Sequence, residues 1–482
     1  MRINVLTGPP TGREGEPEPR VFDSAMSPVD RDALNELVEG VRDIDLAAPP
    51  VILPDFHHKA TMEMPSSIAV ATTGTIRPTF TSSSVNCGMA LLALEMEPPS
   101  REAIERFYGQ VRDRYPCPPT RRVELSGSSV IDAASRGAEF AVDHFGMEAD
   151  DLERIEEGGR LDLERYGGAD AVRRQLPSLT VHLSRMRFGT IGRSNHFLEL
   201  QRVEEVHDPE VAARLGVRQG QLTLQYHGGG GVLAGQVGRM FGRRKKMSRQ
   251  QRMQMSVLKP LFHLASARSV EEIRRRMSLY FADGHPPVPL DGPEGTRMML
   301  ANAAAMNYGF AYRMATYANL RELAERSFGS VGTKLIVDSP HNSIYEEVVD
   351  GRPAIMHRHN SCRAFPASMM RPGTAFGDVG QAILVPGTHR TSSYLCVTGD
   401  RAERSLFSAC HGAGTMVADL ERRGISRPHP QGHATLRFRY SDAAPEEAQH
   451  LDDRGVDEAI SILTANGLVR PVARMRPLAV LH

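Results

Sequence analysis

Five short segments of this chain set a cysteine or a histidine among small residues. They are Val85-Asn86-Cys87-Gly88-Met89, Ser194-Asn195-His196-Phe197, Tyr226-His227-Gly228-Gly229, Ser339-Pro340-His341-Asn342 and Cys410-His411-Gly412-Ala413-Gly414. One thiol with several imidazoles makes a soft-to-borderline metal site, so the ligand candidates are Cys87, His196, His227 and His341. Residue type alone favours zinc, cobalt or iron over magnesium. A lone cysteine or histidine is more often structural, so the hypothesis requires the segments to meet in space.

His411 is the candidate for covalent chemistry. The Gly412-Ala413-Gly414 run leaves its ring open to a bulky partner, and a neutral imidazole there can attack phosphorus or accept a proton. An ordinary turn histidine is the alternative. The loop 386–393 (PGTHRTSS) follows a predicted strand, and its hydroxyl and backbone N–H groups can hold phosphate.

Glycine-rich and basic stretches give weaker signals. Residues 228–231 are all glycine, but no Walker loop or GxGxxG fingerprint accompanies them, so we predict close backbone approach near His227. The basic run 239–252 is either a phosphate-binding surface or a solvated helix face. Secondary candidates, as phosphate clamps or as satisfied structural groups, are His57, His58, His357, Arg358, His359 and Arg363.

Composition limits the class of protein. Lysine plus arginine and aspartate plus glutamate both number 58, so the chain of 482 residues has no global electrostatic footprint for nucleic acid. Five widely spaced cysteines without a CxxC pair predict a reducing, cytoplasmic setting rather than a disulfide framework. Neither a bilayer-spanning apolar run nor a signal-peptide core is apparent. Because the five segments extend from Cys87 to His411, we expect one large domain with insertions.

Strands and helices intermix without a βαβ rhythm, which predicts an α+β fold with antiparallel or mixed sheets. We expect Ser100 to cap the first clear helix and Gly467 to end the last. The pro- and gly-rich stretch 8–20 is expected to be mobile. The predicted strands are 51–53, 67–73, 90–95, 180–183, 221–226, 334–338, 382–386, 393–398 and 435–440, and the predicted helices are 100–114, 269–282, 295–328 and 456–466.

In its motifs and their order, the chain resembles the RtcB-type RNA ligases, which are GTP-dependent enzymes of tRNA splicing and RNA repair. The matching segments are Leu53-Pro54-Asp55-Phe56-His57, Asn86-Cys87-Gly88-Met89, Gly189-Thr190-Ile191-Gly192, Asn195-His196-Phe197-Leu198-Glu199, His227-Gly228, Ala305-Met306-Asn307-Tyr308, Asp338-Ser339-Pro340-His341-Asn342, Arg363-Ala364-Phe365-Pro366, Pro386-Gly387, Ser392-Ser393-Tyr394, His411-Gly412-Ala413-Gly414 and Arg476-Pro477-Leu478. The resemblance implies an RtcB-like catalytic domain over residues 45–482, with peripheral helices, a divergent helical insertion at 117–176 and a partly flexible segment at 1–44.

The resemblance also implies a chemistry. Two Mn²⁺ ions would share Cys87, one of them also held by His196 and the other by His227 and His341. His411 would attack the α-phosphorus of GTP and carry GMP to an RNA 3′-phosphate, which arises from a 2′,3′-cyclic phosphate. A 5′-hydroxyl RNA end would then displace GMP. Manganese, GTP, RNA ends and an archease-like activator as a partner follow only from the resemblance.

The nucleotide would contact a set of residues that the resemblance supplies. These are Asp55, Asn195, Glu199, Asn342, Pro386, Gly387, Thr388, His389, Ser393, Gly412, Ala413, Gly414 and His482.

Several positions depart from the family pattern. Ser84 stands where the family has a metal-binding aspartate, the glycines 228–231 replace a Ser-Arg-Gly run, and His482 is the nearest match to a guanine-contacting lysine. Ser361-Cys362 and Thr388-His389-Arg390 also differ. These departures keep two alternatives open, a metal-dependent phosphodiesterase or cyclic-phosphate hydrolase and a non-catalytic RNA-binding paralogue.

Overall fold

The computed structural model describes residues 18–115, 124–191, 196–242, 245–281, 286–442 and 444–482. Asn195, Cys117 and most of the stretch 8–20 lie outside these ranges, so the expectations for them are not addressed below. None of the helices within these ranges is both long and apolar enough to cross a membrane. The four cysteines they contain are buried and form no disulfide.

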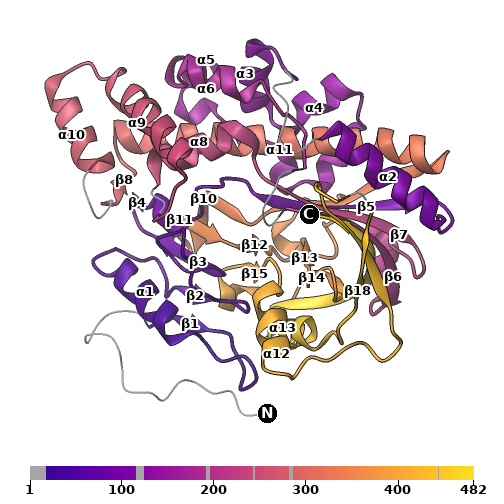
Figure 1. The fold of residues 1–482 in the computed structure, drawn as a ribbon. Coiled ribbons are helices and arrows are strands. Elements are labelled where there is room, and N and C mark those ends of the chain that lie inside the picture. The colour runs from indigo at the N-terminus through magenta and orange to yellow at the C-terminus, as the bar shows by residue number, and fades with distance from the viewer. Residues whose placement is uncertain (1–17, 116–123, 192–195, 243–244, 282–285, 443) are drawn as a thin grey trace.

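A large sheet forms the centre of the molecule (Figure 1). Its strands follow the order β13-β14-β18-β6-β7-β5-β9, and β16 and β17 extend it beside β18. Neighbours are antiparallel except for the parallel pair β16 and β18. β18, the last strand of the chain, thus lies inside the sheet between β14 and β6. The bounds are β5 Gly88–Glu95, β6 Leu198–Val206, β7 Leu222–Gly228, β9 Gly332–Pro340, β13 Ala382–Val385, β14 Ser393–Thr398, β16 Ala434–Phe438, β17 Glu446–Gln449 and β18 Val469–Leu481.

Smaller sheets adjoin the large one where strands pass from one to the other. β9 ends at Pro340 and β10 begins at Asn342, so His341 lies at the junction between two sheets. One small sheet has the order β1-β2-β3-β11-β10, a second joins β12 to β15 and a third joins β4 to β8. Their bounds are β1 Arg20–Val21, β2 Val51–Ile52, β3 Ile68–Thr72, β4 Thr75–Ile76, β8 Val288–Pro289, β10 Asn342–Val349, β11 Arg352–His359, β12 Ser361–Arg363 and β15 Ser408–Cys410.

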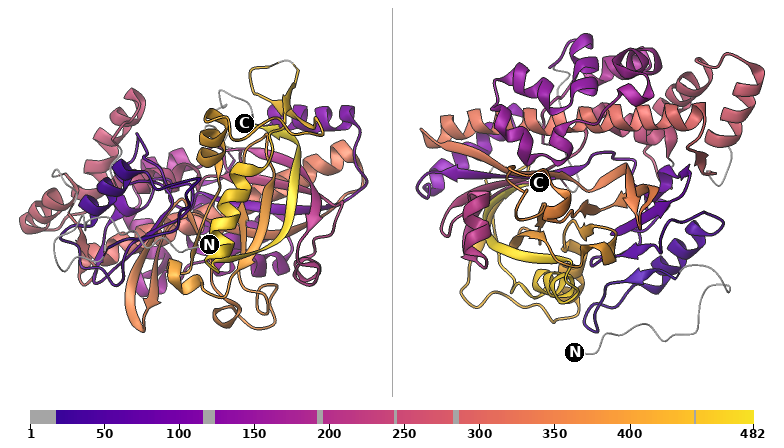
Figure 2. Two further views of the ribbon diagram at one scale, coloured as in Figure 1. Left: turned by 90° about the horizontal axis from the view of Figure 1, so that it is seen from below. Right: turned by 180° about the vertical axis from the view of Figure 1, so that it is seen from behind.

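Helices cover one face of the large sheet, and the 36-residue helix α11 (Pro293–Phe328) runs across the width of the molecule (Figure 2). Side chains of β5 alternate between the two faces, as the strand period of two requires. Leu92 and Leu94 pack in the core that contains α11, whereas Leu91 packs in a separate core on the other face. The other helices are α1 Arg31–Val41, α2 Arg101–Arg114, α3 Gly127–Arg136, α4 Ala138–Phe145, α5 Gly168–Gln175, α6 Ser178–Ser184, α7 Pro209–Leu215, α8 Gly231–Phe241, α9 Arg249–Leu264, α10 Val270–Tyr280, α12 Gly414–Arg422 and α13 Arg454–Ala465.

The α+β prediction with mixed and antiparallel sheets is confirmed, and most predicted elements appear within a few residues of their expected ends. Ser100 caps α2 by accepting a hydrogen bond from the Ala103 N–H group. The predicted strand 180–183 is wrong, because these residues belong to α6. Four residues of alternating polar and apolar character, here Thr180-Val181-His182-Leu183, are too few to distinguish a strand from a helix turn. Here the chain turns at Pro177, and the Ser184 hydroxyl bonds back to the Thr180 carbonyl, which is a helical contact.

Candidate active site

The sheet register brings three of the predicted ligand segments to one edge. β5 pairs with both β7 and β9, so Gly88 lies opposite Gly228 on one side and Pro340 on the other. Cys87, His227 and His341 are next to these three paired residues, and they therefore become neighbours. The Cys87 Sγ atom lies 3.2 Å from His227 Nε2.

His196 and His411 complete the cluster. His196 Nε2 is 3.4 Å from Cys87 Sγ, and the ring centroids of His227 and His341 are 4.9 Å apart. His411 follows β15, and its ring centroid lies 4.4 Å from that of His341. The five cysteine and histidine residues singled out in the sequence thus converge on one place.

The side chains of this cluster fit a bound cation. One ligand atom each from Cys87, His227 and His341 lie within 4.8 Å of one another. Ligands bonded to one tetrahedral ion at ~2.0–2.3 Å are about 3.5 Å apart, close to the two Sγ–Nε2 distances. Both ring nitrogens of His341 are buried without a hydrogen-bond partner in the described part of the chain. Because buried polar groups are normally paired, these nitrogens point to a ligand that the protein does not supply.

Burial sets the protonation states in the cluster. It lowers the pKa of His196 to about 4 and that of His341 well below its ordinary value, so both imidazoles keep a free lone pair. Burial also raises the pKa of the Cys87 thiol to about 12, although the Arg313 charge opposes this. A cation in the cluster would compensate a thiolate and remove its proton, as coordinated metals do.

The four glycines after His227 allow the backbone to pass through a crowded space. A methyl group at Gly229 would lie 3.0 Å from His196 Cε1, and one at Gly230 would lie 2.4 Å from the Val85 carbonyl oxygen. Gly231 has a φ of +70°, and a methyl there would meet the Tyr312 ring at 2.7 Å. The predicted close backbone approach near His227 is confirmed, and it occurs against the ligand segments themselves.

His411 is held by the start of helix α12. Burial lowers its pKa to about 3, so the imidazole is neutral at physiological pH. The buried Asp55 carboxylate accepts the Met416 N–H group at 2.7 Å in the first turn of α12. Asp55, which the resemblance assigned to the nucleotide, therefore caps the helix that follows His411. Burial raises the pKa of Asp55 to about 7.

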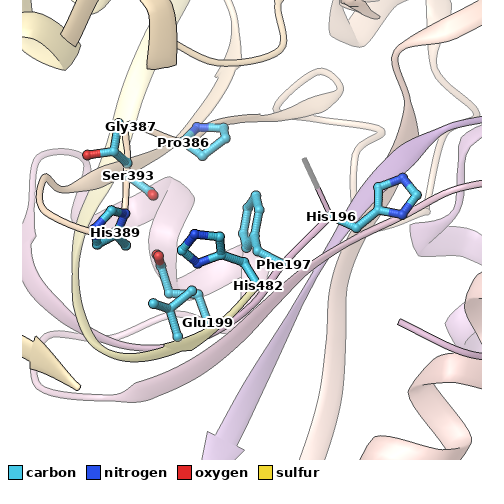
Figure 3. A pocket seen from close by; sticks show the side chains of 10 residues that line it. His196, Phe197, Glu199, Pro386, Gly387, His389, Ser393 and His482 are labelled. Carbon is cyan, nitrogen blue, oxygen red and sulfur yellow. The ribbon is translucent and has the colours of Figure 1, made fainter. Parts of the chain in front are cut away.

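A cavity of about 140 Å³ opens beside the cluster (Figure 3). His196 belongs to both places, because it lines the cavity and contacts Cys87. The lining contains seven of the residues that the resemblance assigned to the nucleotide, namely Glu199, Pro386, Gly387, Thr388, His389, Ser393 and His482, together with His196, Phe197 and Val480. Strands β6, β14 and β18 and the loop after β13 supply these side chains.

Two polar groups of the cavity, on His482 and Glu199, already have protein partners. Arg437 donates to His482 Nε2 at 2.8 Å, which leaves Nδ1 as the protonated nitrogen of a neutral ring. The rings of His389 and His482 lie 5.4 Å apart. Gln201 donates to the Glu199 carboxyl at 2.6 Å, and burial raises the pKa of Glu199 to about 8.

Among the described residues, the other nucleotide candidates lie around the cluster rather than in the cavity lining. Asn342 Oδ1 accepts the Asn360 N–H group and its carbonyl accepts the Asn86 N–H group, so Asn342 ties the Cys87 segment to β12. The Ala413 N–H group donates to the Pro386 carbonyl, and a methyl at Gly412 would lie 3.2 Å from the same oxygen. The Gly412-Ala413-Gly414 turn thus packs against the loop that lines the cavity.

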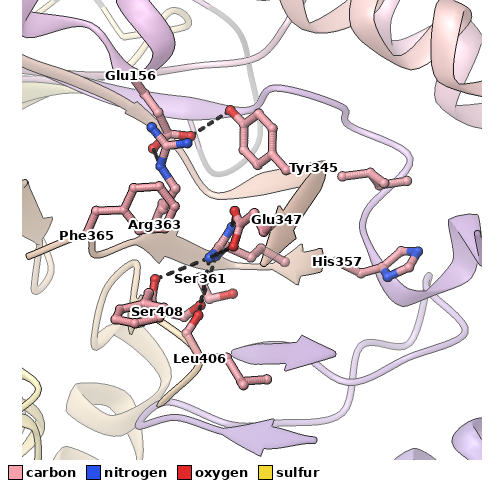
Figure 4. Close-up of polar contacts among 12 residues, drawn as sticks. Glu156, Tyr345, Glu347, His357, Ser361, Arg363, Phe365, Leu406 and Ser408 are labelled. Atoms are coloured by element: carbon pink, nitrogen blue, oxygen red, sulfur yellow. Dashed lines mark hydrogen bonds and ion pairs between the residues drawn. The ribbon is translucent and has the colours of Figure 1, made fainter. Parts of the chain in front are cut away.

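The two secondary arginines are engaged by carboxylates. Arg358 is fully buried and forms a bidentate pair with Glu347 at 2.6 and 3.0 Å, and it also donates to Ser408. Arg363 pairs with Glu157 and lies 3.8 Å from Glu156, and Figure 4 shows Arg363 beside Glu156. The structure therefore supports the structural role for both arginines, since Arg363 belongs to β12 and Arg358 binds Ser408 of β15, the strand before His411.

The secondary histidines also have structural contacts. His57 Nδ1 lies 2.7 Å from the Asp55 carbonyl, and His58 pairs with Glu36 at 2.8 Å on the surface. The Arg77 N–H group donates to His357 Nε2 at 3.1 Å. His359 is buried, and its Nδ1 atom has no partner among the described residues.

Three residues near the cluster carried no signal that we used in the sequence. Arg313 is buried in α11 and donates to Asn86 and Asp338. Glu156 joins the helical region before α5 to β9 through Ser339 and to β10 through Tyr345. Lys59 lies near His411, where its charge is the largest influence on the pKa of that ring after burial. A lone arginine within a long apolar helix was the one available clue.

Comparisons with known proteins agree with the motifs. A family model described as "tRNA-splicing ligase RtcB" matches residues 41–482. The tRNA-splicing ligase RtcB of Thermococcus kodakarensis is 29% identical over 460 residues, covering 89% of this chain and 86% of that protein. The RNA-splicing ligase RtcB of Mycobacterium tuberculosis is 30% identical over 437 residues, with 84% and 89% coverage. The tRNA-splicing ligase RtcB of Pyrococcus horikoshii is 30% identical over 425 residues, but the chain spans only 44% of its length.

Proposed function

The chain belongs to the RtcB family, and from this premise we propose that it is an RNA ligase that works through a GMP-histidine intermediate. It joins an RNA 3′-phosphate or 2′,3′-cyclic phosphate end to a 5′-hydroxyl end, in RNA repair or tRNA splicing. The observation that carries the proposal is the position of His411 next to the thiol-imidazole cluster. Its imidazole is neutral, and its ring centroid lies 4.4 Å from that of His341.

Each step follows from groups at the site. A His411 ring nitrogen attacks the α-phosphorus of GTP, which forms a phosphorus–nitrogen bond and expels pyrophosphate. An oxygen of the RNA 3′-phosphate then takes GMP from His411. The 5′-hydroxyl of the second RNA attacks the activated 3′-phosphate, forms the phosphodiester and releases GMP. Low imidazole pKa values keep the nucleophile unprotonated throughout.

The metal ions belong to the same proposal. Cys87, His196, His227 and His341 would hold two Mn²⁺ ions, with Cys87 as the shared ligand, His196 on one side and His227 and His341 on the other. Such ions would supply Lewis acidity and would neutralise charge on the triphosphate. Ser84 offers only a hydroxyl where the family has a carboxylate, so the position next to His196 is the weaker of the two.

The cavity beside His196 is the proposed site for the guanine nucleotide. Its 140 Å³ volume, its two neutral histidines and the loop 386–393 suit a base whose phosphates extend toward His411. Lys246, Arg249 and Arg252 are exposed on the segment that follows α8, and we propose that they contact RNA phosphates. An archease-like activator remains a candidate partner on the resemblance alone.

The deciding experiment uses α-labelled GTP with Mn²⁺, followed by denaturing electrophoresis. We expect a label on the protein that acid removes and alkali does not, and that disappears in His411→Ala. His357→Ala is the matched control, because it removes another buried imidazole outside the cluster. Full ligation of a 3′-phosphate RNA to a 5′-hydroxyl RNA by His411→Ala would refute the nucleophile assignment.

A cyclic-phosphate hydrolase is the second candidate function, and Ser84 is the observation that favours it. Loss of one carboxylate weakens a two-ion site more than a one-ion hydrolytic site. Hydrolysis of a 2′,3′-cyclic phosphate RNA end to a 3′-phosphate end without GTP would support it. If Ser84→Asp raises both Mn²⁺ affinity and ligation, the serine is a lost ligand in a ligase. Binding of metal and RNA without either reaction would indicate the non-catalytic paralogue.

A further inference from the structure

One arginine is buried in the middle of the long helix beneath the cluster. Arg313 is the single charged residue of the chain between Met298 and Leu320, and its side chain is 0% exposed. Its guanidinium makes a bidentate pair with Asp338, with an Nη2–Oδ1 distance of 2.6 Å. A buried ion pair contributes little net stability, because desolvation offsets the attraction, so its position calls for another explanation.

Arg313 contacts all three segments that carry Cys87, His227 and His341. Its Nη1 atom donates to the Asn86 carbonyl at 2.5 Å and to the Asn86 side-chain oxygen at 2.7 Å. Asp338 lies three residues before His341 on β9. The Tyr226 hydroxyl, next to His227, donates to the Arg313 carbonyl at 2.9 Å. The contact with Tyr226 uses the Arg313 backbone, so the guanidinium itself joins the Cys87 segment to the β9 end that carries His341.

The Cys87 segment needs such support. Asn86 has a φ of 56°, in the left-handed region that non-glycine residues adopt at a cost. Its N–H group donates to the Asn342 carbonyl and its side chain to the Met306 carbonyl. A methyl group at Gly88 would lie 2.9 Å from the Arg313 Cζ atom, so the guanidinium packs directly under the turn.

We propose that Arg313 is the positioning residue of the metal centre. Its planar guanidinium fixes the Asn86 backbone and the β9 end together, which keeps the Cys87 and His341 donor atoms in place when no ion is bound. Five donors in a rigid fork suit this task, and a lysine ammonium does not reproduce them. The inference rests on the metal centre of the proposed function, but not on ligation.

A second buried pair provides a matched control. Arg276 of α10 and Glu294 of α11 lie 2.6 Å apart and are both about as buried as the Arg313 pair. The Tyr280 hydroxyl also donates to Glu294, and none of these residues contacts a ligand segment. Removing this pair tests what the loss of a buried arginine–carboxylate pair on α11 does to the protein in general.

The experiment compares Arg313→Met/Asp338→Asn with Arg276→Met/Glu294→Gln in the full chain. Each double variant removes both charges of its pair, and the control also takes Glu294 from the buried Arg297, so it perturbs buried charge at least as much. Chelator-treated protein is titrated with Co²⁺, and the thiolate-to-cobalt absorption band is followed beside denaturant unfolding. We expect the Arg313 pair variant to bind Co²⁺ about 10–100-fold more weakly, with a changed band, as for other groups that orient metal ligands. The Arg276 pair variant should lose comparable stability and keep wild-type Co²⁺ affinity.

Each other outcome is decisive. Equal Co²⁺ affinity and an unchanged band in the folded Arg313 pair variant would overturn the proposal. A wild-type protein with no thiolate–cobalt band would remove the metal centre and this inference with it. A wild-type protein that binds Co²⁺ but does not ligate RNA would contradict only the proposed ligation. If the double variant does not fold, Arg313→Lys keeps the charge and removes the fork, and it must show the same loss of affinity.

Discussion

The ligand cluster and the cavity beside it differ in whether their buried polar atoms have hydrogen-bond partners. In the cluster, both His341 ring nitrogens are buried without a partner among the described residues. In the cavity, His482 and Glu199 already accept hydrogen bonds from Arg437 and Gln201. The cluster therefore leaves a place for an ion, whereas a ligand in the cavity must exchange contacts that the protein has made. Unpaired buried atoms mark a binding place more sharply than the volume of a cavity does.

The largest expected effect is on the cluster side. Cys87→Ser replaces a thiolate with a hydroxyl, and we expect metal affinity to fall about 1000-fold, or about 4 kcal/mol. Isothermal titration with Mn²⁺ and Zn²⁺ measures it. Cys396→Ser is the control, since Cys396 is equally buried but lies in β14 away from the cluster. Unaltered metal content in Cys87→Ser would remove the bridging role.

A change at Asp55 tests a buried carboxyl group that has a hydrogen-bond partner and can ionise near neutral pH. Its pKa of about 7 in the fold exceeds its ordinary value of 3.8, so the folded protein holds this proton more tightly than the unfolded chain. The folded state therefore gains stability from this proton, in full below pH 3.8. The free energy of unfolding falls by at most about 4 kcal/mol as the pH rises from 3.8 through 7. Asp55→Asn keeps the acceptor for the Met416 N–H group and cannot ionise. We expect it to be more stable than wild type by about 2 kcal/mol at pH 8 and by little at pH 4.

Thermal unfolding of the metal-free proteins between pH 4 and pH 8 checks this expectation. Asp419→Asn, an exposed acid in the same helix, serves as control. A constant difference between Asp55→Asn and wild type across this range would show that Asp55 is ionised without penalty in the fold.

The smallest effect is expected in the cavity. His482→Ala should weaken GTP binding about tenfold, or about 1.4 kcal/mol, and leave metal affinity unchanged, because the lost contact is one of several. His482→Lys should restore the affinity if a donor at this position reads the base. Equilibrium binding of a fluorescent GTP analogue provides the measurement. Wild-type GTP affinity in His482→Ala, or a fall in metal affinity, would contradict the separation of the two regions.

Residue type and order were enough to find the cluster, because cysteine and histidine are uncommon residues and the glycines beside them are visible in the sequence. Cys87, His196, His227, His341 and His411 were selected from such segments, and the sheet register brings Cys87, His227 and His341 together. The glycines at 228–231 also allow the close backbone approach that the sequence predicted. The role of Asp55 was not foreseen, because a helix cap that joins residues 55 and 416 depends on tertiary structure.

Other features were hidden by the lack of a local pattern. Helix α11 is buried on nearly every side over most of its length, so its periodicity does not reveal which face meets the cluster. The sequence therefore shows that Arg313 is alone among uncharged residues, but not which groups it contacts. The segment 180–183 was misassigned because four alternating residues carry no information on hydrogen-bond partners, which decide between α6 and a strand.

The inner position of β18 has a consequence for folding. Val469–Leu481 pairs with both β14 and β6 in the middle of the large sheet. Until β18 pairs, those two strands present open edges, which are templates for pairing with other chains. A partly folded chain that lacks this one strand is therefore the species most exposed to aggregation.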